Sequence, residues 1–424
     1  MADLRNIAWE MPLHFPAEQG GFGCVFVEPG GIGCHRTARR RMIREKQESM
    51  HNIKVAIAGV GNCASSLIQG ITYYNNHDIE APTGLMHPDI GGWGPGDLEI
   101  VAAFDVDRRK VGRPLEEAIF AKPNCTMVFE DDLPSSGVTV QMGSILDGVT
   151  PHMADYPDDE AFRSADADPV DVAGVLNQTG VDVLVCYLPV GSEQAALHYA
   201  QACLDARVAM VNCIPVFIAS NPEWAEKFRK AGVPIVGDDI KSQVGATIVH
   251  RILTRLFGDR GYTLDRTYQL NTGGNTDFLN MKDLDRLKSK KISKTESVQS
   301  QLDERLQSRD IHIGPSDYVP WQGDNKVAFI RMEGRGFGGA PIDLELRLSV
   351  QDSPNSAGVV IDAIRCAKLG MASGMAGPLE APSSYYMKSP AVQMRDSVAR
   401  DLCDAFIEER TAEAAPAKDI KAAE

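Results

Sequence analysis

No stretch of the sequence approaches the roughly twenty apolar residues that a membrane-spanning helix needs. The first fifty residues also lack the apolar core of a secretory signal peptide. Positive charge is in deficit, because 43 Lys and Arg stand against 58 Asp and Glu and give a net charge of −15. These absences argue against a membrane protein, a secreted protein and nonspecific nucleic-acid binding, although local lysines can still hold an anionic substrate.

Paired cysteines are also missing. The nine cysteines form no C-x-x-C pair and no regular spacing, and Cys186 and Cys213 lie within apolar runs. We therefore expect reduced thiols in a cytoplasmic protein, used as small apolar residues. No His/Cys cluster has the spacing of a structural zinc site, so any metal would be held mainly by carboxylate, phosphate and water.

A nucleotide-binding pattern lies near the start of the regular sequence. The apolar run 53–58 is followed by G-x-G-x-x-A at 59–64 and by an apolar-faced helix from Ser65 onward. In this context the glycines bring the backbone close to a pyrophosphate, and the helix N-terminus favours its negative charge. The alternative is an ordinary glycine turn between a strand and a helix.

The acidic partner of this motif is expected at Asp105, at the end of the predicted strand 100–104. In such folds this residue binds a ribose hydroxyl, usually about twenty residues after the glycines. The Gly/Pro-rich segment 82–96 explains the delay as an insertion. The alternative is a turn residue at a strand end.

Strand and helix patterns alternate from residue 53 to residue 257 and predict a doubly wound parallel sheet. The expected strands are 138–143, 181–188, 208–213 and 234–236, and the expected helices are 192–206, 222–231 and 243–257. Runs rich in β-formers then predict an antiparallel α+β domain, with strands 263–270, 326–332 and 341–350 and a helix-like stretch 281–307. Strict alternation over 343–350 predicts one buried face and one face that is wet or paired with a subunit.

The predicted fold class is thus α/β, a Rossmann-type doubly wound parallel sheet with an inserted α+β catalytic and oligomerisation domain. The expected divisions are a disordered N-terminal extension 1–50, an NAD-binding domain 51–257, the inserted domain 258–352, a return to the first domain 353–408, and a disordered tail 409–424. Met50 precedes the first strand, so residues 1–49 are expected to be dispensable or to lie upstream of the true start.

Four lysines and one loop are candidates for the chemistry. Lys290 and Lys294 are four apart and share a face if helical, whereas Lys326 and Lys388 follow turn-like or tyrosine-rich segments. Each lysine alone is more often a solvated side chain. The segment 237–245 joins a predicted strand to a predicted helix, which is where parallel sheets bind ligands. Ser242 is the expected N-cap there, and the N–H groups that follow are suited to a phosphate.

Several segments in order carry a resemblance that is more specific than the glycine turn. They are GVGNCASS (59–66), AAFDVD (102–107), CYLPVGSE (186–193), VPIVGDDIKSQVGAT (233–247), LNTGGNTDFLNM (270–281), KSKKISKT (288–295), GDNKVA (323–328), QDSPNSAGVVIDA (351–363) and YYMKSP (385–390). Together they resemble the myo-inositol-1-phosphate synthase family in its prokaryotic form, from about residue 53 to about residue 407.

The resemblance implies a redox-neutral isomerase that uses NAD to convert D-glucose 6-phosphate to 1D-myo-inositol 3-phosphate, the first step of inositol and inositol-phospholipid biosynthesis. The family oxidises C5, enolises, closes the ring by an aldol step and reduces C5 again. The resemblance also implies a homotetramer and a cation, divalent or monovalent, near the cofactor.

Carried over residue by residue, the resemblance assigns three groups of site residues. The catalytic lysines are Lys290, Lys294, Lys326 and Lys388, with Lys290 and Lys326 in proton transfer and oxyanion stabilisation, Lys294 at the phosphate and Lys388 at the C5 oxygen. The cofactor residues are Gly59, Val60, Gly61, Asn62, Cys63, Ala64, Asp105, Asp239, Asn275, Thr276, Asp277, Asp324 and Asp352. The substrate-phosphate residues are Ser242, Gln243, Val244 and Gly245.

Two other functions stay open on the sequence. An NAD-linked dehydrogenase of a small hydroxy- or amino-acid would need a second substrate and would accumulate NADH. A nucleotide-sensing protein without turnover would bind NAD but would not depend on Lys290 or Lys294.

Overall fold

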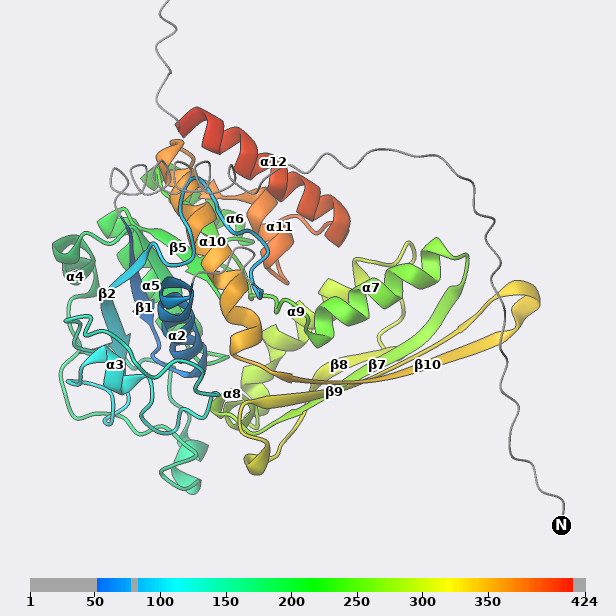
Figure 1. The fold of residues 1–424 in the computed structure, drawn as a ribbon. Helices are drawn as coiled ribbons and strands as arrows, with labels where there is room; N and C mark the ends of the chain where they lie inside the picture. Colours follow the sequence, from blue (N-terminus) through cyan, green and yellow to red (C-terminus); the bar gives the residue numbers. More distant parts are fainter. Residues whose placement is uncertain (1–51, 78–82, 415–424) are drawn as a thin grey trace, which may run out of the picture. The chain divides into compact units, whose positions relative to one another are not determined.

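The computed structural model describes residues 52–77 and 83–414. The predicted N-terminal extension, Met50 and residues 415–424 of the predicted tail lie outside these ranges. The described chain contains two sheets, one of seven strands and one of four (Figure 1).

The seven-stranded sheet has the order β11-β6-β5-β4-β1-β2-β3, and every neighbouring pair is parallel. Its strands are β1 (Ile53–Ala58), β2 (Leu98–Asp105), β3 (Gln141–Met142), β4 (Val183–Cys186), β5 (Ala209–Asn212), β6 (Pro234–Val236) and β11 (Gly377–Pro378). The predicted Rossmann-type sheet is confirmed, although β3, β4 and β5 are shorter than predicted. The late strand β11 joins it from the C-terminal part of the chain.

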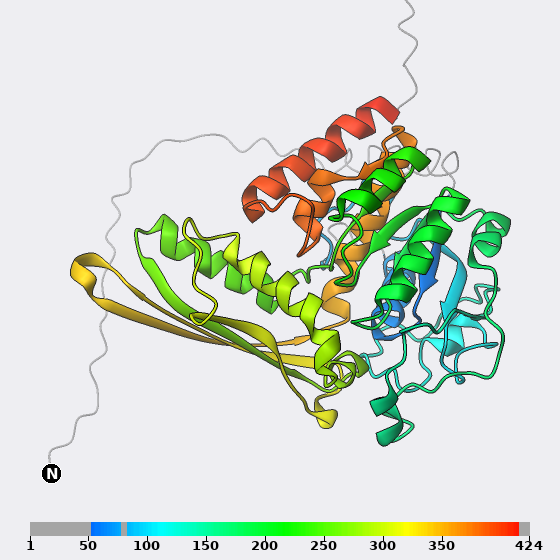
Figure 2. The same cartoon turned by 180° about the vertical axis from the view of Figure 1, so that it is seen from behind.

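Helices cover both faces of this sheet (Figures 1 and 2). They are α2 (Asn62–Asn76), α3 (Leu115–Ala118), α4 (Val172–Thr179), α5 (Glu193–Ala206), α6 (Pro222–Ala231) and α10 (Pro354–Ala372). The side chains of Leu184 and Cys186 on β4 share a buried core with residues of α4, α5 and α6. Because side chains alternate along a strand, the other face of β4 is turned toward α10, which contacts this strand.

Local capping explains why α6 has the predicted bounds. The Asn221 side chain accepts hydrogen bonds from the N–H groups of Glu223 and Trp224 at 2.9 and 3.2 Å. Pro222 occupies the first helical position, and Gly232 ends the helix in the left-handed conformation with φ 74°. All three signals are local, so the sequence predicts both ends of the helix.

The four-stranded sheet has the order β10-β9-β7-β8. Its strands are β7 (Thr263–Gly273), β8 (Ile311–Tyr318), β9 (Asn325–Arg335) and β10 (Pro341–Gln351). The β7–β9 and β9–β10 pairs are antiparallel, but β7 and β8 are parallel, so the prediction of an antiparallel domain is wrong for this pair. Strand β8 was not predicted, because its IHIGPSDY sequence contains the strand breakers Gly and Pro.

One face of the four-stranded sheet is covered by α7 (Ala246–Asp259) and α9 (Leu287–Gln299) (Figures 1 and 2). The short α8 (Thr276–Asn280) and a 3₁₀ turn (Leu284–Arg286) link β7 to α9. On β10 the side chains of Leu344, Leu346 and Leu348 are half-buried and alternate with exposed residues. The predicted alternation is present, but its apolar face is not fully buried in the single chain.

The chain ends with α11 (Glu380–Tyr386) and α12 (Asp396–Ala414). The predicted disordered tail from 409 is wrong at its start, because α12 continues to Ala414. None of the helices in the described ranges is long and apolar enough to cross a membrane. The seven cysteines that the structure describes are free thiols, as predicted for them.

Candidate functional site: a nucleotide cavity joined to a lysine cavity

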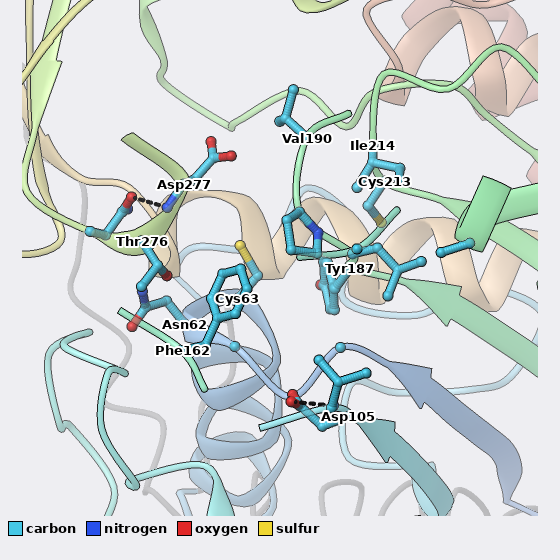
Figure 3. Close-up of a pocket in the computed structure, with 18 of the residues that line it drawn as sticks. Asn62, Cys63, Asp105, Phe162, Tyr187, Val190, Cys213, Ile214, Thr276 and Asp277 are labelled. Carbon is cyan, nitrogen blue, oxygen red and sulfur yellow. Dashed lines mark hydrogen bonds between the residues drawn. The ribbon is translucent and has the colours of Figure 1, made fainter. Parts of the chain in front are cut away.

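Two cavities meet at the carboxyl edge of the parallel sheet. The first, named the nucleotide cavity after the motif in its wall, is lined by the glycine turn, the end of β2 and the segment after β4. The second, named the lysine cavity, is lined by the four candidate lysines and the start of α7. The residues that line both are Cys63, Cys213, Asp239, Ile240, Lys290 and Asp352. Figure 3 shows the labelled wall of the first cavity, with Cys63 between Asp105 and Asp277.

The glycine turn is held close to its neighbours. Gly59 has φ +95°, and a Cβ built on it would lie 2.7 Å from the carbonyl oxygen of Tyr187. Gly61 differs, because a Cβ there would meet no described heavy atom within 4 Å. Gly61 lines the first cavity, so the space over it is open to a ligand.

The start of α2 offers unpaired donors beside that space. The first hydrogen bond of α2 runs from the Ser65 N–H to the Gly61 carbonyl, and no side chain caps the helix. The N–H groups of residues 62–64 therefore have no partner within the helix. The buried Tyr187 hydroxyl in the same cavity has no hydrogen-bond partner among the described residues. Open space, free N–H groups and an unused hydroxyl fit the pyrophosphate of a dinucleotide.

The predicted residues of the turn have distinct placements. Asp105 accepts a hydrogen bond from the Val60 N–H at 2.7 Å, so it braces the turn from the end of β2. The Asn62 side chain accepts from the N–H groups of Cys125 and Thr126, at 2.7 and 3.0 Å, and thereby fixes the neighbouring loop. Ala64 is fully buried, as the third small residue of the motif requires.

Three of the four lysines form an ion pair with one carboxylate each. The Nζ–carboxylate distances are 2.5 Å for Lys290 with Asp277, 2.6 Å for Lys326 with Asp352, and 2.9 Å for Lys388 with Asp239. These lysines come from α9, β9 and the segment after α11, so residues far apart in sequence converge here. Lys290 and Lys294 share one face of α9, as predicted.

Lys294 is the exception. Its side chain is 4% exposed, and its Nζ makes no hydrogen bond or ion pair with any described residue. Burial, together with the positive charges of Lys290, Lys326 and Lys388, lowers the pKa of Lys294 well below its ordinary value. An unpaired buried ammonium is unfavourable unless a ligand supplies the opposite charge.

The lysine charges also shift the pKa values of the carboxylates that line both cavities. Burial alone would raise the pKa of Asp239, but Lys388 and Lys290 lower it. Burial would likewise raise the pKa of Asp352, and Lys326 lowers it. Ser293 of α9 donates a hydrogen bond to Asp239 at 2.6 Å and fixes its orientation. Both carboxylates are therefore ionised partners of the lysines at neutral pH.

Only part of the predicted phosphate loop lies at the lysine cavity. Ser242 and Gly245 line the lysine cavity. The N–H groups of Gln243 and Val244 instead donate to the backbone and side-chain oxygens of Asn355, at 2.8 and 3.1 Å. Ser242 is not the N-cap, because α7 begins at Ala246 with Gly245 at the cap position and no side-chain cap. The free donors that face the lysine cavity belong to the first turn of α7, at residues 246–248.

Asp324 lines neither cavity, and Asn275 lines only the nucleotide cavity. Asp324 accepts hydrogen bonds from the Asn275 side chain at 2.9 Å and from the Ser353 hydroxyl at 2.9 Å. Asp277 lies two residues after Asn275, and Asp352 lies directly before Ser353, so these hydrogen bonds are close to the carboxylates that pair with Lys290 and Lys326. Burial raises the pKa of Asp324. Thr276 and Asp277 line the nucleotide cavity.

Four residues that hold site residues in place were not predicted, and they are Ser293, Asn355, Lys110 and Asn124. No motif marks them, since each acts through a partner distant in sequence. In the part of the chain that the structure describes, no group of three His, Cys, Asp or Glu residues is arranged to hold a metal. The cation therefore stays a prediction.

Sequence comparisons match this chain to one family. The family described as myo-inositol-1-phosphate synthase matches residues 245–353. The chain is 56% identical over 366 residues to the inositol-3-phosphate synthase of Mycolicibacterium smegmatis, covering 85% of this chain and 99% of that protein. It is 54% identical over 365 residues to the inositol-3-phosphate synthase of Corynebacterium glutamicum, with coverage of 85% and 99%.

Solved structures give the same fold. The crystal structure of Ari2 aligns with a TM-score of 0.70 and 35% identity, covering 86% of this chain and 99% of that one. Inositol-3-phosphate synthase from Caenorhabditis elegans aligns with a TM-score of 0.66 over 88% of each chain, and at 15% identity it supports the fold alone.

The parallel sheet, with two cavities at its carboxyl edge, defines an α/β protein of the Rossmann type. The chain belongs to the inositol-3-phosphate synthase family, also called the myo-inositol-1-phosphate synthase family, and is an enzyme of that family.

Proposed function

We propose that the enzyme converts D-glucose 6-phosphate to 1D-myo-inositol 3-phosphate and uses NAD without net consumption. The observation that carries this proposal is the shared wall between the nucleotide cavity and the lysine cavity. A cofactor in the first cavity and a phosphorylated sugar in the second would be in contact across Cys63 and Asp239.

NAD, when bound, supplies a reversible two-electron oxidation at C5 of the sugar. The residues that would hold it are the glycine turn 59–61, the first N–H groups of α2, and Asp105. The turn and the helix N-terminus favour the pyrophosphate charge. The fit of open space and unused donors supports NAD as the cofactor.

The substrate phosphate belongs, in this proposal, at the first turn of α7 next to Lys294. Three carboxylates already pair with Lys290, Lys326 and Lys388, so Lys294 is left to an external anion. A phosphate there gains a helix N-terminus and a buried ammonium together.

The other lysines would stabilise the negative oxygen that develops during enolisation and ring closure. Lys290 and Lys326 are assigned to that oxygen and to proton transfer, and Lys388 to the C5 oxygen. Fixed ammonium groups in a closed site lower the energy of an oxyanion without reorganising water. Because both of these lysines line the same cavity, proton transfer is assigned to Lys290 and Lys326 together rather than to one of them.

A homotetramer built on the four-stranded sheet is also part of the proposal. Its support is the sheet face opposite α7 and α9, where Tyr268 and Phe329 are 36% and 44% exposed. A face of this kind is suited to pairing with another copy of the chain.

The function is tested by incubating the purified protein with glucose 6-phosphate and a catalytic amount of NAD. We expect inositol phosphate to accumulate in many-fold excess over NAD, with no net absorbance of NADH at the end. NADH that accumulates in step with product would favour a dehydrogenase. NAD binding without any product would favour a nucleotide sensor.

The two glycines of the turn make a matched pair for the cofactor site. Gly61→Ala should weaken NAD binding roughly tenfold or more without lowering stability, because its Cβ enters ligand space and touches no described protein atom. Gly59→Ala should lower stability as well, because of its positive φ and the contact with Tyr187. Calorimetric titration with NAD and urea unfolding of both variants check this. Unchanged NAD affinity in Gly61→Ala would contradict the assigned site.

A further inference from the structure

Lys110 is a buried charge that the proposed function has not used. It lies in the turn after β2, is 3% exposed and lines the nucleotide cavity. Its Nζ donates hydrogen bonds to the Val60 carbonyl at 2.8 Å and to the Asn124 side chain at 2.9 Å. An ammonium has three protons to donate, so one is left.

The nearest carboxylate does not use this remaining proton. Asp105 Oδ2 lies 4.0 Å from Lys110 Nζ, which is beyond hydrogen-bond range. The Asp105 oxygens accept from the N–H groups of Val60, Val106 and Asp107, at 2.7, 2.7 and 2.8 Å. A carboxylate offers about four acceptor positions, so one acceptor also remains, on Oδ2.

The free donor and the free acceptor thus belong to two residues that line the same cavity. An oxygen atom at hydrogen-bond distance from both Lys110 Nζ and Asp105 Oδ2 fits a 4.0 Å separation. A carbonyl oxygen would satisfy only Lys110, because it cannot donate to Asp105, whereas a water molecule could satisfy both groups until a ligand displaces it. A hydroxyl satisfies both sides, because it gives its proton to Asp105 and accepts one from Lys110.

We propose that Lys110 binds a ribose hydroxyl of the adenosine half of NAD, as the donor that complements the acceptor Asp105. The inference rests on the proposed use of NAD. It adds a second binding residue to the ribose site and explains why a lysine is buried beside the glycine turn. The positive charge also offsets Asp105, which lowers the cost of keeping that carboxylate in a partly buried site.

A purely structural role makes a different prediction. Asn124 also donates to the Val60 carbonyl, at 3.1 Å, so Lys110 and Asn124 both brace the turn. If Lys110 only braces Val60, its loss should lower the affinity for every ligand that contacts the turn by the same factor. If it binds the ribose, its loss should matter only for ligands that carry the hydroxyl.

The test compares NAD with its 2′-deoxyadenosine and 3′-deoxyadenosine analogues by calorimetric titration. We expect Lys110→Met to bind NAD roughly 10- to 100-fold more weakly than the wild type. We expect Lys110→Met and the wild type to bind one of the deoxy analogues, the one that lacks the contacted hydroxyl, with equal affinity. Asn124→Ala is the matched control, and it should lower the affinity for NAD and for both analogues by the same factor.

Equal weakening of all three ligands by Lys110→Met would overturn the inference and leave Lys110 as a brace. If that variant does not fold, Lys110→Gln, which keeps a donor for Val60, carries the same comparison. Failure of the wild type to bind NAD would instead contradict the proposed function, so the two failures are distinguishable.

Discussion

Lys294→Met is expected to lower kcat/KM by about 10³-fold while NAD binds as in the wild type. Lys294 lines the lysine cavity but is absent from the nucleotide cavity. Its Nζ lacks a partner among the described residues, whereas the other three lysines each hold a carboxylate. The substitution therefore removes a charge that only the bound phosphate would use.

The same substitution should not lower stability. Methionine fills the space of the lysine stem without a buried charge, so the urea midpoint should be unchanged or higher. The lowered pKa of Lys294 means that the unfolded chain binds a proton more tightly than the folded one, so its contribution to stability rises as pH increases toward about 10.4. The stability gap between variant and wild type should accordingly narrow at alkaline pH.

Lys291→Met is the matched control, because Lys291 is an exposed neighbour on the same helix. Steady-state kinetics, NAD titration and urea unfolding at pH 7 and pH 10 give the three readouts. Full activity of Lys294→Met would refute the phosphate role.

Asp238→Ala is expected to lower the free energy of unfolding by about 3–5 kcal/mol. Asp238 is fully buried and accepts hydrogen bonds from the Asn212 amide, the N–H groups of residues 218–220 and the Ser220 hydroxyl, at 2.7 to 3.1 Å. Burial raises the pKa of Asp238 to about 6, so it is still ionised at neutral pH. Alanine would leave several buried donors without an acceptor, and each costs free energy.

Asp238→Ala should also disturb the active site, because Asp238 is followed directly by Asp239, the partner of Lys388. Asp238→Asn should cause an intermediate loss in the free energy of unfolding. Its amide keeps one acceptor oxygen, but its NH₂ group faces N–H or O–H donors that the carboxylate accepted from. Asp159→Ala, on an exposed aspartate, should change stability by no more than about 0.5 kcal/mol. Urea unfolding followed by circular dichroism measures all three. A loss below about 1 kcal/mol for Asp238→Ala would show that water replaces the carboxylate.

Elements with local signals could be predicted from the sequence. The cap and glycine of α6 fixed both of its ends, and β6 has the predicted bounds. The strand β8 could not be predicted, because its Gly and Pro weaken the local pattern and its pairing with β7 depends on packing beside α9. Likewise, Ser242 has the residue type of a cap, but the contacts of Asn355 with residues 243–244 delay the helix to Ala246.

The sequence by itself determined the parallel sheet and the glycine turn with Asp105, and it singled out the four lysines that line one cavity, since periodicity, small residues and ordered motifs are present along the chain. Only the tertiary structure decided which carboxylate each lysine pairs with, that Lys294 has none, and that Lys110 faces Asp105. These properties depend on atoms brought together from distant segments. The protonation and ligand preference of a buried charge follow from its neighbours in space, which the order of residues does not specify.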